Sequence, residues 1–172
     1  AGGNPSSGSV GAGTGATVGK ICGMERAMKS GLGMYAVQLG ELRMAAVVAV
    51  NALGDIFDSS TGRKIAGLRT EDGTAFSDSC EELWKMGQRE NLFTGNTTIG
   101  AVITNGKFNK AQMNKIASMT RNAYARCINP VGTMADGDSI YAASAGEVEA
   151  DLNVAGTLAA YVMERAIVAA IR

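Results

Sequence analysis

The tetrapeptide Gly95-Asn96-Thr97-Thr98 stands where a polar stretch gives way to a buried apolar one, and it carries a hydroxyl that could act as a nucleophile. If the chain is cut before Thr97, this threonine holds both the hydroxyl and a free α-amine. The ordinary pKa of such an amine is about 7.7 to 8.0, so it can act as the general base for its own hydroxyl. Such a base suits this chain, because the sequence contains no histidine, the commonest general base in proteins. Taken alone, an Asn-Thr pair at such a junction is more often ordinary turn chemistry.

Two carboxylates separated by one glycine, Asp136 and Asp138, form the second group of interest. Around a glycine, such a pair can point into one site and hold an ammonium group or orient a hydroxyl. By itself the pair is more typical of a solvated turn. A calcium loop is a poorer interpretation, since no further ligands follow at the required spacing.

A glycine-rich tract near the N-terminus ends in a lysine and superficially resembles a phosphate-binding loop. Its fixed residues are Gly11, Gly13, Gly15, Gly19 and Lys20. A Walker A motif needs glycine where Thr14 stands and serine or threonine where Ile21 stands. The dinucleotide fingerprint also needs a strand immediately before the loop, and residues 6–9 do not form such a pattern. Nucleotide binding is therefore disfavoured, and a close-packed turn is the simpler interpretation.

The composition favours one folded domain with a small, neutral partner. The chain has 172 residues, of which 46% are hydrophobic, so it can bury a sizeable core. Sixteen basic residues balance 16 acidic ones, and a net charge of zero favours neither nucleic acid nor a membrane surface as partner.

The cysteines and the longest apolar stretch indicate where in the cell the protein is expected. Three widely spaced cysteines, Cys22, Cys80 and Cys127, indicate neither a disulfide framework nor a zinc site, so a cytoplasmic protein without metal or cofactor is expected. The apolar stretch 154–171 contains Glu164 and is expected to be a buried amphipathic helix rather than a membrane span.

The elements that must position these residues follow an α/β pattern in which two long helices cover one face of a sheet. Asn51 stands where the second strand ends and can present a polar side chain there. The expected helices are 20–29, 81–86, 109–128 and 151–172, and the expected strands are 33–39, 42–50, 56–58, 64–68, 97–104 and 138–144. The polar, irregular stretch 69–95 is the best linker in the chain.

Four motifs occur in one order with long spacings and together are far more specific than any one of them. They are Gly11 to Lys20, Ala49-Val50-Asn51-Ala52-Leu53-Gly54-Asp55, Gly95-Asn96-Thr97-Thr98-Ile99-Gly100 and Asp136-Gly137-Asp138. This set resembles the DmpA-type self-processing aminopeptidase family, and within it the branch of nylon-oligomer (6-aminohexanoate oligomer) hydrolases, whose nucleophile is threonine. The resemblance covers nearly the whole chain.

The resemblance implies an α/β fold arranged as a layered αββα sandwich of the type shared with the ornithine acetyltransferases. It also implies a precursor that cuts itself between Asn96 and Thr97. Residues 1–96 are then the C-terminal part of the larger (α) subunit, with 69–96 as the linker before the cut. Residues 97–172 form the smaller (β) subunit, and the two parts together make one domain.

The resemblance also assigns roles to individual residues. Thr97 is the expected nucleophile, and Asn51 is expected in the oxyanion hole. Lys20 is expected to support the site electrostatically, and Asp136 and Asp138 to position the nucleophile or its amine. The implied reaction passes through an acyl-enzyme and hydrolyses small peptides, amino-acid amides or linear 6-aminohexanoate oligomers, with no cofactor or metal.

One departure from the family pattern keeps other functions open. Family precursors carry a further segment ahead of the point where this sequence starts, and that N-terminal segment is an expected partner that completes the sheet and the substrate pocket. A homo-oligomer of tetramer type is also expected by resemblance. The alternatives are a catalytically silent structural or assembly module of the same fold, and an acyl transferase like the ornithine acetyltransferases.

Overall fold

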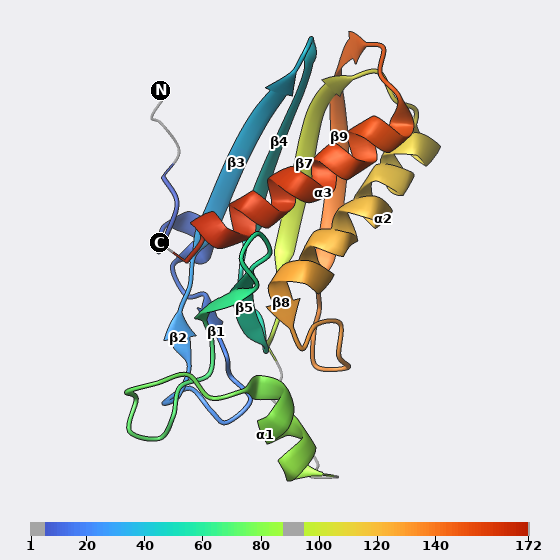
Figure 1. The fold of residues 1–172 in the computed structure, drawn as a ribbon. Coiled ribbons are helices and arrows are strands. Elements are labelled where there is room, and N and C mark those ends of the chain that lie inside the picture. Colours follow the sequence, from blue (N-terminus) through green and yellow to red (C-terminus); the bar gives the residue numbers. More distant parts are fainter. Residues whose placement is uncertain (1–5, 88–94, 172) are drawn as a thin grey trace.

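A four-stranded sheet backed by two long helices forms the centre of the computed structural model, which describes residues 6–87 and 95–171. The order of the strands in the sheet is β3-β4-β7-β9. Their bounds are β3 Leu32–Leu39, β4 Leu42–Ala49, β7 Ile99–Gly106 and β9 Ser139–Val148. Helices α2 (Lys110–Cys127) and α3 (Leu152–Ala169) lie side by side across one face of this sheet (Figure 1).

Alternation of side chains along β4 decides which face meets the helices. Leu42, Met44, Ala46 and Val48 are all buried and recur at every second position, which is the period of a strand with one face in the core. Strand β4 pairs antiparallel with both β3 and β7. Strand β7 instead pairs parallel with β9, and α2 lies in the connection between them. The expected α/β pattern, with two helices on one sheet face, is confirmed.

Each long helix begins at a side-chain cap that the sequence supplies. Asn109 accepts a hydrogen bond from Gln112 N at 3.0 Å while the Gln112 side chain accepts one from Asn109 N at 2.9 Å, forming a capping box. Asp151 caps α3 through the amides of Asn153 and Val154. Helix α3 is long and apolar enough to cross a membrane by length and composition alone, but here it packs on β3 and β4 with half of its length buried.

Smaller elements fill the end of the molecule below the main sheet (Figure 1). They are the 3-10 turn η1 (Gly11–Gly13), the pair β1 (Thr17–Val18) and β2 (Met28–Lys29), the sheet of β5 (Asp55–Asp58), β6 (Arg63–Ala66) and β8 (Ile128–Asn129), and helix α1 (Ser79–Met86). The expected hairpin, now β5 and β6, and the expected short helix α1 are both present. Only part of the expected linker can be compared, because residues 88–94 lie outside the described residues.

One expected element is wrong, and two expected element boundaries are shifted. Residues 20–29 form turns followed by β2 rather than a helix, because the main chain of Lys20 bonds to Leu53 O and Gly23 takes a φ of 104°, outside the helical region. The strand expected from Thr97 begins only at Ile99, and Ile128 belongs to β8 rather than to the preceding helix.

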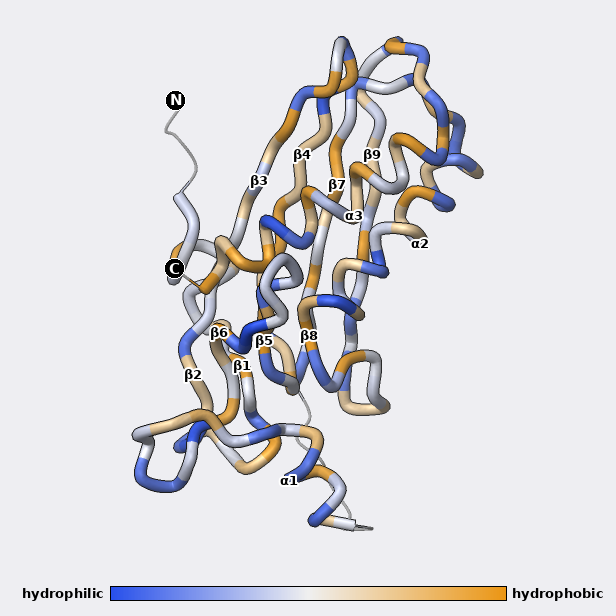
Figure 2. Tube along the Cα trace, in the orientation of Figure 1, coloured by the Kyte–Doolittle hydropathy of each residue, from blue (hydrophilic) through white to orange (hydrophobic). Residues whose placement is uncertain are grey.

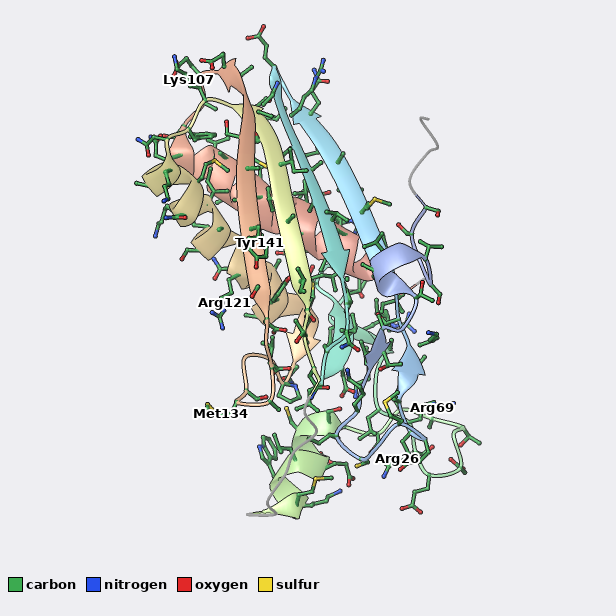
Figure 3. All side chains as sticks on the ribbon, turned by 180° about the vertical axis from the view of Figure 1, so that it is seen from behind. Arg26, Arg69, Lys107, Arg121, Met134 and Tyr141 are labelled. Carbon is green, nitrogen blue, oxygen red and sulfur yellow. The ribbon has the colours of Figure 1, made fainter. Side chains whose placement is uncertain are left out.

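The face of the main sheet away from the helices is mostly apolar, and several of its side chains are exposed. Figure 3 looks onto this face and shows Tyr141 on β9, which is 65% exposed. Ile99 and Ile103 of β7 face the same way and are about half exposed. Hydrophobic segments recur along β7 and α3 in Figure 2, whereas α2 carries several hydrophilic ones. This face matters for function because the candidate site opens onto it.

Candidate active site

Lys20, Asn51 and Thr97 meet where β4 ends and the segment before β7 begins. The main-chain nitrogen of Thr97 donates to the carbonyl oxygen of Asn51 at 3.0 Å. The ammonium group of Lys20 donates to that same oxygen at 3.1 Å and to Asn51 Oδ1 at 2.8 Å. The structure therefore brings together three of the residues that the sequence analysis selected, although 31 and 77 positions separate Lys20 from Asn51 and Thr97.

Gly19 places Lys20 in this site. It has a φ of 68°, a conformation that side-chain-bearing residues rarely adopt, and its nitrogen donates to Gly54 O at 2.9 Å. A Cβ on Gly19 would lie 2.0 Å from the nitrogen of Leu68. The turn that carries Lys20 into the site therefore requires glycine, which gives the glycine tract a steric function and supports its interpretation as a close-packed turn.

Burial controls the charge of Lys20. Its side chain is buried, and the loss of solvation lowers the pKa of the ammonium group from 10.5 to about 8, although the negative charge of Asp136 works in the opposite direction. Its Nζ donates to two oxygens of Asn51. Lys20 is therefore a cation held at the site whose proton is lost far more readily than that of a surface lysine.

The amide of Asn51 is oriented by partners on both sides. Its Oδ1 accepts hydrogen bonds from Lys20 Nζ at 2.8 Å and from Thr17 N at 3.2 Å. Its Nδ2 donates to the carbonyl oxygen of Gly95 at 2.9 Å. Since the oxygen faces two donors, the Nδ2 group must face the segment that precedes Thr97.

The segment 136–139 lies alongside Asn96, Thr97 and Thr98 and binds them through the main chain. Asn96 and Asp136 form a parallel β-bridge, and Gly137 N donates to Asn96 O at 2.8 Å. Ser139 N donates to Thr98 O at 3.1 Å. The Thr97 hydroxyl donates to Asn96 O at 2.6 Å, so it lies against the peptide bond that would be cut.

The two carboxylates act on this segment in different ways. Asp138 Oδ1 accepts from Thr98 N at 2.7 Å, while Asp136 Oδ2 accepts from the nitrogen and the hydroxyl of Thr133 at 2.9 and 2.8 Å. Burial raises the pKa of Asp138, and the hydrogen bond from Thr98 partly offsets that effect. Within the described residues, neither carboxylate is hydrogen-bonded to the Thr97 hydroxyl. Both fix the chain around Thr97 instead.

A cavity of about 470 Å³ adjoins Thr97 and Asn51 on the open face of the sheet. Its lining is mostly apolar and includes no charged side chain; the larger apolar lining residues are Leu32, Val47, Val48 and Ile99. A cavity of about 520 Å³ lies farther along the same face, at Arg43 and Asn105, but none of the site residues lines it. No group of three His, Cys, Asp or Glu side chains suited to a metal ion occurs among residues 6–87 and 95–171.

Three groups at this site escaped the sequence analysis. The Gly137 amide and the Gly95 carbonyl are main-chain groups, and nothing in a residue type marks them. The hydroxyl of Tyr124 donates to Thr98 O at 3.3 Å from the middle of α2. The only sequence signal for Gly137 is its place between two acidic residues.

Solved structures with the same fold include an esterase/amidase and an aminopeptidase. The L-aminopeptidase D-Ala-esterase/amidase of Ochrobactrum anthropi, described as a variant of the Ntn hydrolase fold, matches 99% of this chain and 46% of its own, with a TM-score of 0.64 and 18% identity. A Burkholderia sp. beta-aminopeptidase matches 98% of this chain and 47% of its own, with a TM-score of 0.59 and 17% identity. These matches confirm the expected fold class, which is that of this Ntn hydrolase variant.

Residues 1–172 match peptidase family S58, and the chain belongs to that family. A 6-aminohexanoate-oligomer endohydrolase of Kocuria sp. (strain KY2) is 30% identical over 149 residues, which are 83% of this chain and 40% of that protein. An aminopeptidase of Mycobacterium leprae (strain TN), itself uncharacterized, is 32% identical over 145 residues, or 83% of this chain and 38% of that protein. The chain thus spans about two fifths of the length of these relatives. The expected family is confirmed.

Proposed function

We propose that this chain is the catalytic part of an amide hydrolase that cuts itself between Asn96 and Thr97 and then uses Thr97 as an N-terminal nucleophile. The observation that carries the proposal is the position of Thr97. Its hydroxyl lies 2.6 Å from the oxygen of the carbonyl that it would attack, and its nitrogen lies 3.0 Å from Asn51 O.

The cut creates the base that the second reaction needs. Once the peptide bond is broken, the Thr97 nitrogen is an α-amine that shares the acceptor Asn51 O with Lys20 Nζ. A second positive charge beside Lys20 is unfavourable, so the amine stays neutral and can accept the proton of the Thr97 hydroxyl. This arrangement supplies a proton acceptor in a chain that has no histidine.

Asn51 is the proposed oxyanion donor for substrates. In the uncut chain its Nδ2 group is occupied by Gly95 O, which belongs to the segment that ends at the cut. When that segment withdraws, the Nδ2 group is free to donate to the oxygen of a substrate carbonyl. Stabilisation of this kind is worth on the order of 3 kcal/mol in comparable sites. Asp136 and Asp138 serve the site by holding residues 96–98 in register.

The mostly apolar cavity supports a substrate that places an uncharged aliphatic stem beside the amide that is cut. Its lining offers no charged side chain to pair with a substrate carboxylate or ammonium group. Linear 6-aminohexanoate oligomers, small peptides and amino-acid amides all present a carbonyl beside an aliphatic stem. The Kocuria sp. relative, whose match covers 83% of this chain, is named a 6-aminohexanoate-oligomer endohydrolase. That name supports 6-aminohexanoate oligomers as substrates.

The two products of the cut are proposed to remain one domain. Strand β4 lies before the cut and β7 after it, and they pair from Met44↔Thr104 to Ala49↔Ile99. Residues 1–96 and 97–172 would therefore stay joined by a continuous antiparallel ladder.

The free thiols of Cys22, Cys80 and Cys127 support a reducing location, and the cytoplasm is the proposed one.

Intact-mass spectrometry tests the proposal directly. After folding, the wild-type protein should resolve into two polypeptides divided before Thr97, and the Thr97→Ala variant should stay a single chain. The cut protein should then hydrolyse a chromogenic amino-acid amide or a 6-aminohexanoate oligomer. A wild-type protein that remains one chain under folding conditions contradicts the proposal.

The mostly apolar sheet face favours a second candidate, an assembly module without turnover. Exposed residues such as Ile103 and Tyr141 would be covered by the N-terminal segment expected from the family resemblance, or by further copies in a tetramer-type homo-oligomer. Sedimentation analysis combined with the amide assay separates the candidates. A large assembly that cuts no amide supports the module, and turnover supports the hydrolase.

A further inference from the structure

The carbonyl oxygen of Asn96 is held by two donors in the uncut chain. One is the hydroxyl of Thr97, at 2.6 Å, and the other is the main-chain nitrogen of Gly137, at 2.8 Å. Asn96 is buried, with 2% of its surface exposed, so water does not compete freely for this oxygen. The two donors have different parts to play, because only the hydroxyl takes part in bond making.

Charge develops on this same oxygen when the chain cuts itself. The Thr97 oxygen forms a bond to the carbonyl carbon of Asn96 as its proton leaves, and the carbonyl oxygen becomes negative. The carbon–nitrogen bond then breaks, the nitrogen of Thr97 gains a proton, and an ester remains. Water hydrolyses that ester to give the Asn96 carboxylate and the free Thr97 hydroxyl. A fixed donor 2.7 to 3.1 Å from the oxyanion lowers the barrier to its formation.

Gly137 N meets that distance and is held there from both sides. Before it, the Asp136 carboxylate is tied to the nitrogen and hydroxyl of Thr133. After it, Asp138 Oδ1 accepts from Thr98 N at 2.7 Å. The nitrogen of Gly137 therefore does not need to reorganise when charge appears on Asn96 O, which is the property that makes such a donor effective.

The absence of a side chain at Gly137 is also required. A Cβ built there would lie 2.7 Å from Thr97 Oγ1, closer than non-bonded carbon and oxygen atoms approach. Only glycine lets this segment bring an N–H group to the carbonyl while leaving the attacking hydroxyl in place. This explains in steric terms why a glycine separates the two acidic residues.

We propose that the main-chain amide of Gly137 is the oxyanion donor of the self-cleavage reaction. This inference rests on the proposed function and assigns a catalytic group to it. Asn51 Nδ2 and Gly137 N then serve different carbonyls. In the uncut chain, Gly137 N already contacts the carbonyl that is cut, whereas Asn51 Nδ2 contacts Gly95 O, one residue earlier.

An amide-to-ester replacement tests this donor without adding a side chain. Cys127 allows a synthetic segment 127–172 to be ligated to a recombinant segment 1–126 in denaturant, so that refolding starts the reaction. Three proteins are compared: the all-amide chain, a chain with glycolic acid at position 137, and a control with glycolic acid at position 132. Gly132 lies in the same loop, five residues before Gly137.

The rate at which the fragment starting at Thr97 appears is followed by mass spectrometry. The ester at 137 should slow cleavage about 100-fold to 1,000-fold, whereas the ester at 132 should cut about as fast as the all-amide chain. The same esters in a Thr97→Ala background measure the effect on folding alone. There the ester at 137 should change the unfolding equilibrium by about 10-fold or less, as expected for one main-chain hydrogen bond.

The outcomes separate this inference from the proposed function. Equal cleavage rates in all three proteins, or a rate loss no larger than the loss of stability, would overturn the role of Gly137 and leave self-cleavage intact. An all-amide chain that never cuts would overturn both.

Discussion

The main-chain nitrogen of Thr97 lies 3.0 Å from the carbonyl oxygen of Asn51, and Lys20 Nζ donates to that oxygen as well. One main-chain acceptor at the end of β4 thus aligns the proposed nucleophile with the nearest buried cation.

Paired substitutions at neighbouring threonines should have opposite effects. Thr97→Val keeps the shape of the side chain but removes the hydroxyl, so cleavage should stop. Thr98 Oγ1 is buried without a hydrogen-bond partner in the described structure, so Thr98→Val should leave cleavage intact and stabilise the fold by about 1 kcal/mol. Mass spectrometry and urea unfolding measure the two effects. Continued cutting by Thr97→Val would rule out the proposed nucleophile.

Loss of the Asn51 amide should weaken hydrolysis more than substrate binding. In cut protein, Asn51→Ala should lower kcat about 100-fold to 1,000-fold with a smaller change in KM, because the lost donor acts on the transition state. Asn153→Ala, at an exposed position near the start of α3, is the matched control and should be neutral. An unchanged kcat in Asn51→Ala would remove this residue from the oxyanion hole.

A methyl group at Gly137 should impair cleavage far more than folding. The added Cβ lies 2.7 Å from Thr97 Oγ1, and the hydroxyl can escape only by leaving its preferred rotamer, which costs about 1 kcal/mol. Gly137→Ala should therefore lower the melting temperature by only a few degrees, as expected for a change of that size. Its self-cleavage should be at least about 10-fold slower, since the attacking oxygen is displaced. Wild-type cleavage kinetics in this variant would show that the close approach is unimportant.

The buried Lys20 should leave a mark on the pH dependence of stability. Burial lowers its folded-state pKa to about 8 from 10.5, so between these values the unfolded chain binds more protons than the folded one. The free energy of unfolding should therefore rise with pH across this window, and the charged lysine is destabilising below it. Lys20→Met should lack this rise. The difference between the two proteins, from urea unfolding at pH 7.5 and above pH 10, is the measurement; a constant difference would contradict a lowered pKa.

The ion pair of Asp55 with Lys64 should stabilise the loop against which Gly19 packs. Asp55 is buried, accepts from Lys64 Nζ at 2.6 Å and also holds Leu68 N at 2.7 Å. Asp55→Asn should cost about 3 kcal/mol, because a largely buried ammonium group loses its partner.

A double-mutant cycle checks the origin of that cost. Lys64→Met combined with Asp55→Asn should be less destabilising than the sum of the single changes, since the unpaired charge is then absent. The exposed pair of Lys107 with Glu149 is the control, and Glu149→Gln should leave the free energy of unfolding nearly unchanged because solvent screens this pair. Strictly additive effects at Asp55 and Lys64 would contradict a coupled pair.

Much of the architecture could be predicted from local patterns. The alternating burial of β4, the caps Asn109 and Asp151, and the polar break before Thr97 each arise from residues close together in the chain. The family resemblance then selected Lys20, Asn51, Thr97, Asp136 and Asp138, and the structure gathers these residues around residues 95–98. Their catalytic roles remain predictions.

The sequence alone determined which segments bury one side and which residue types are available for chemistry, because amphipathic periodicity and the absence of histidine are local properties. Only the tertiary structure decided that residues 20–29 form turns rather than a helix. It also decided that Thr97 and Lys20 share Asn51 O as acceptor, and that the nitrogen of Gly137 donates to Asn96 O. These contacts join main-chain groups that every residue possesses. Their formation depends on which distant segments pair, and the residue types alone do not predict that pairing.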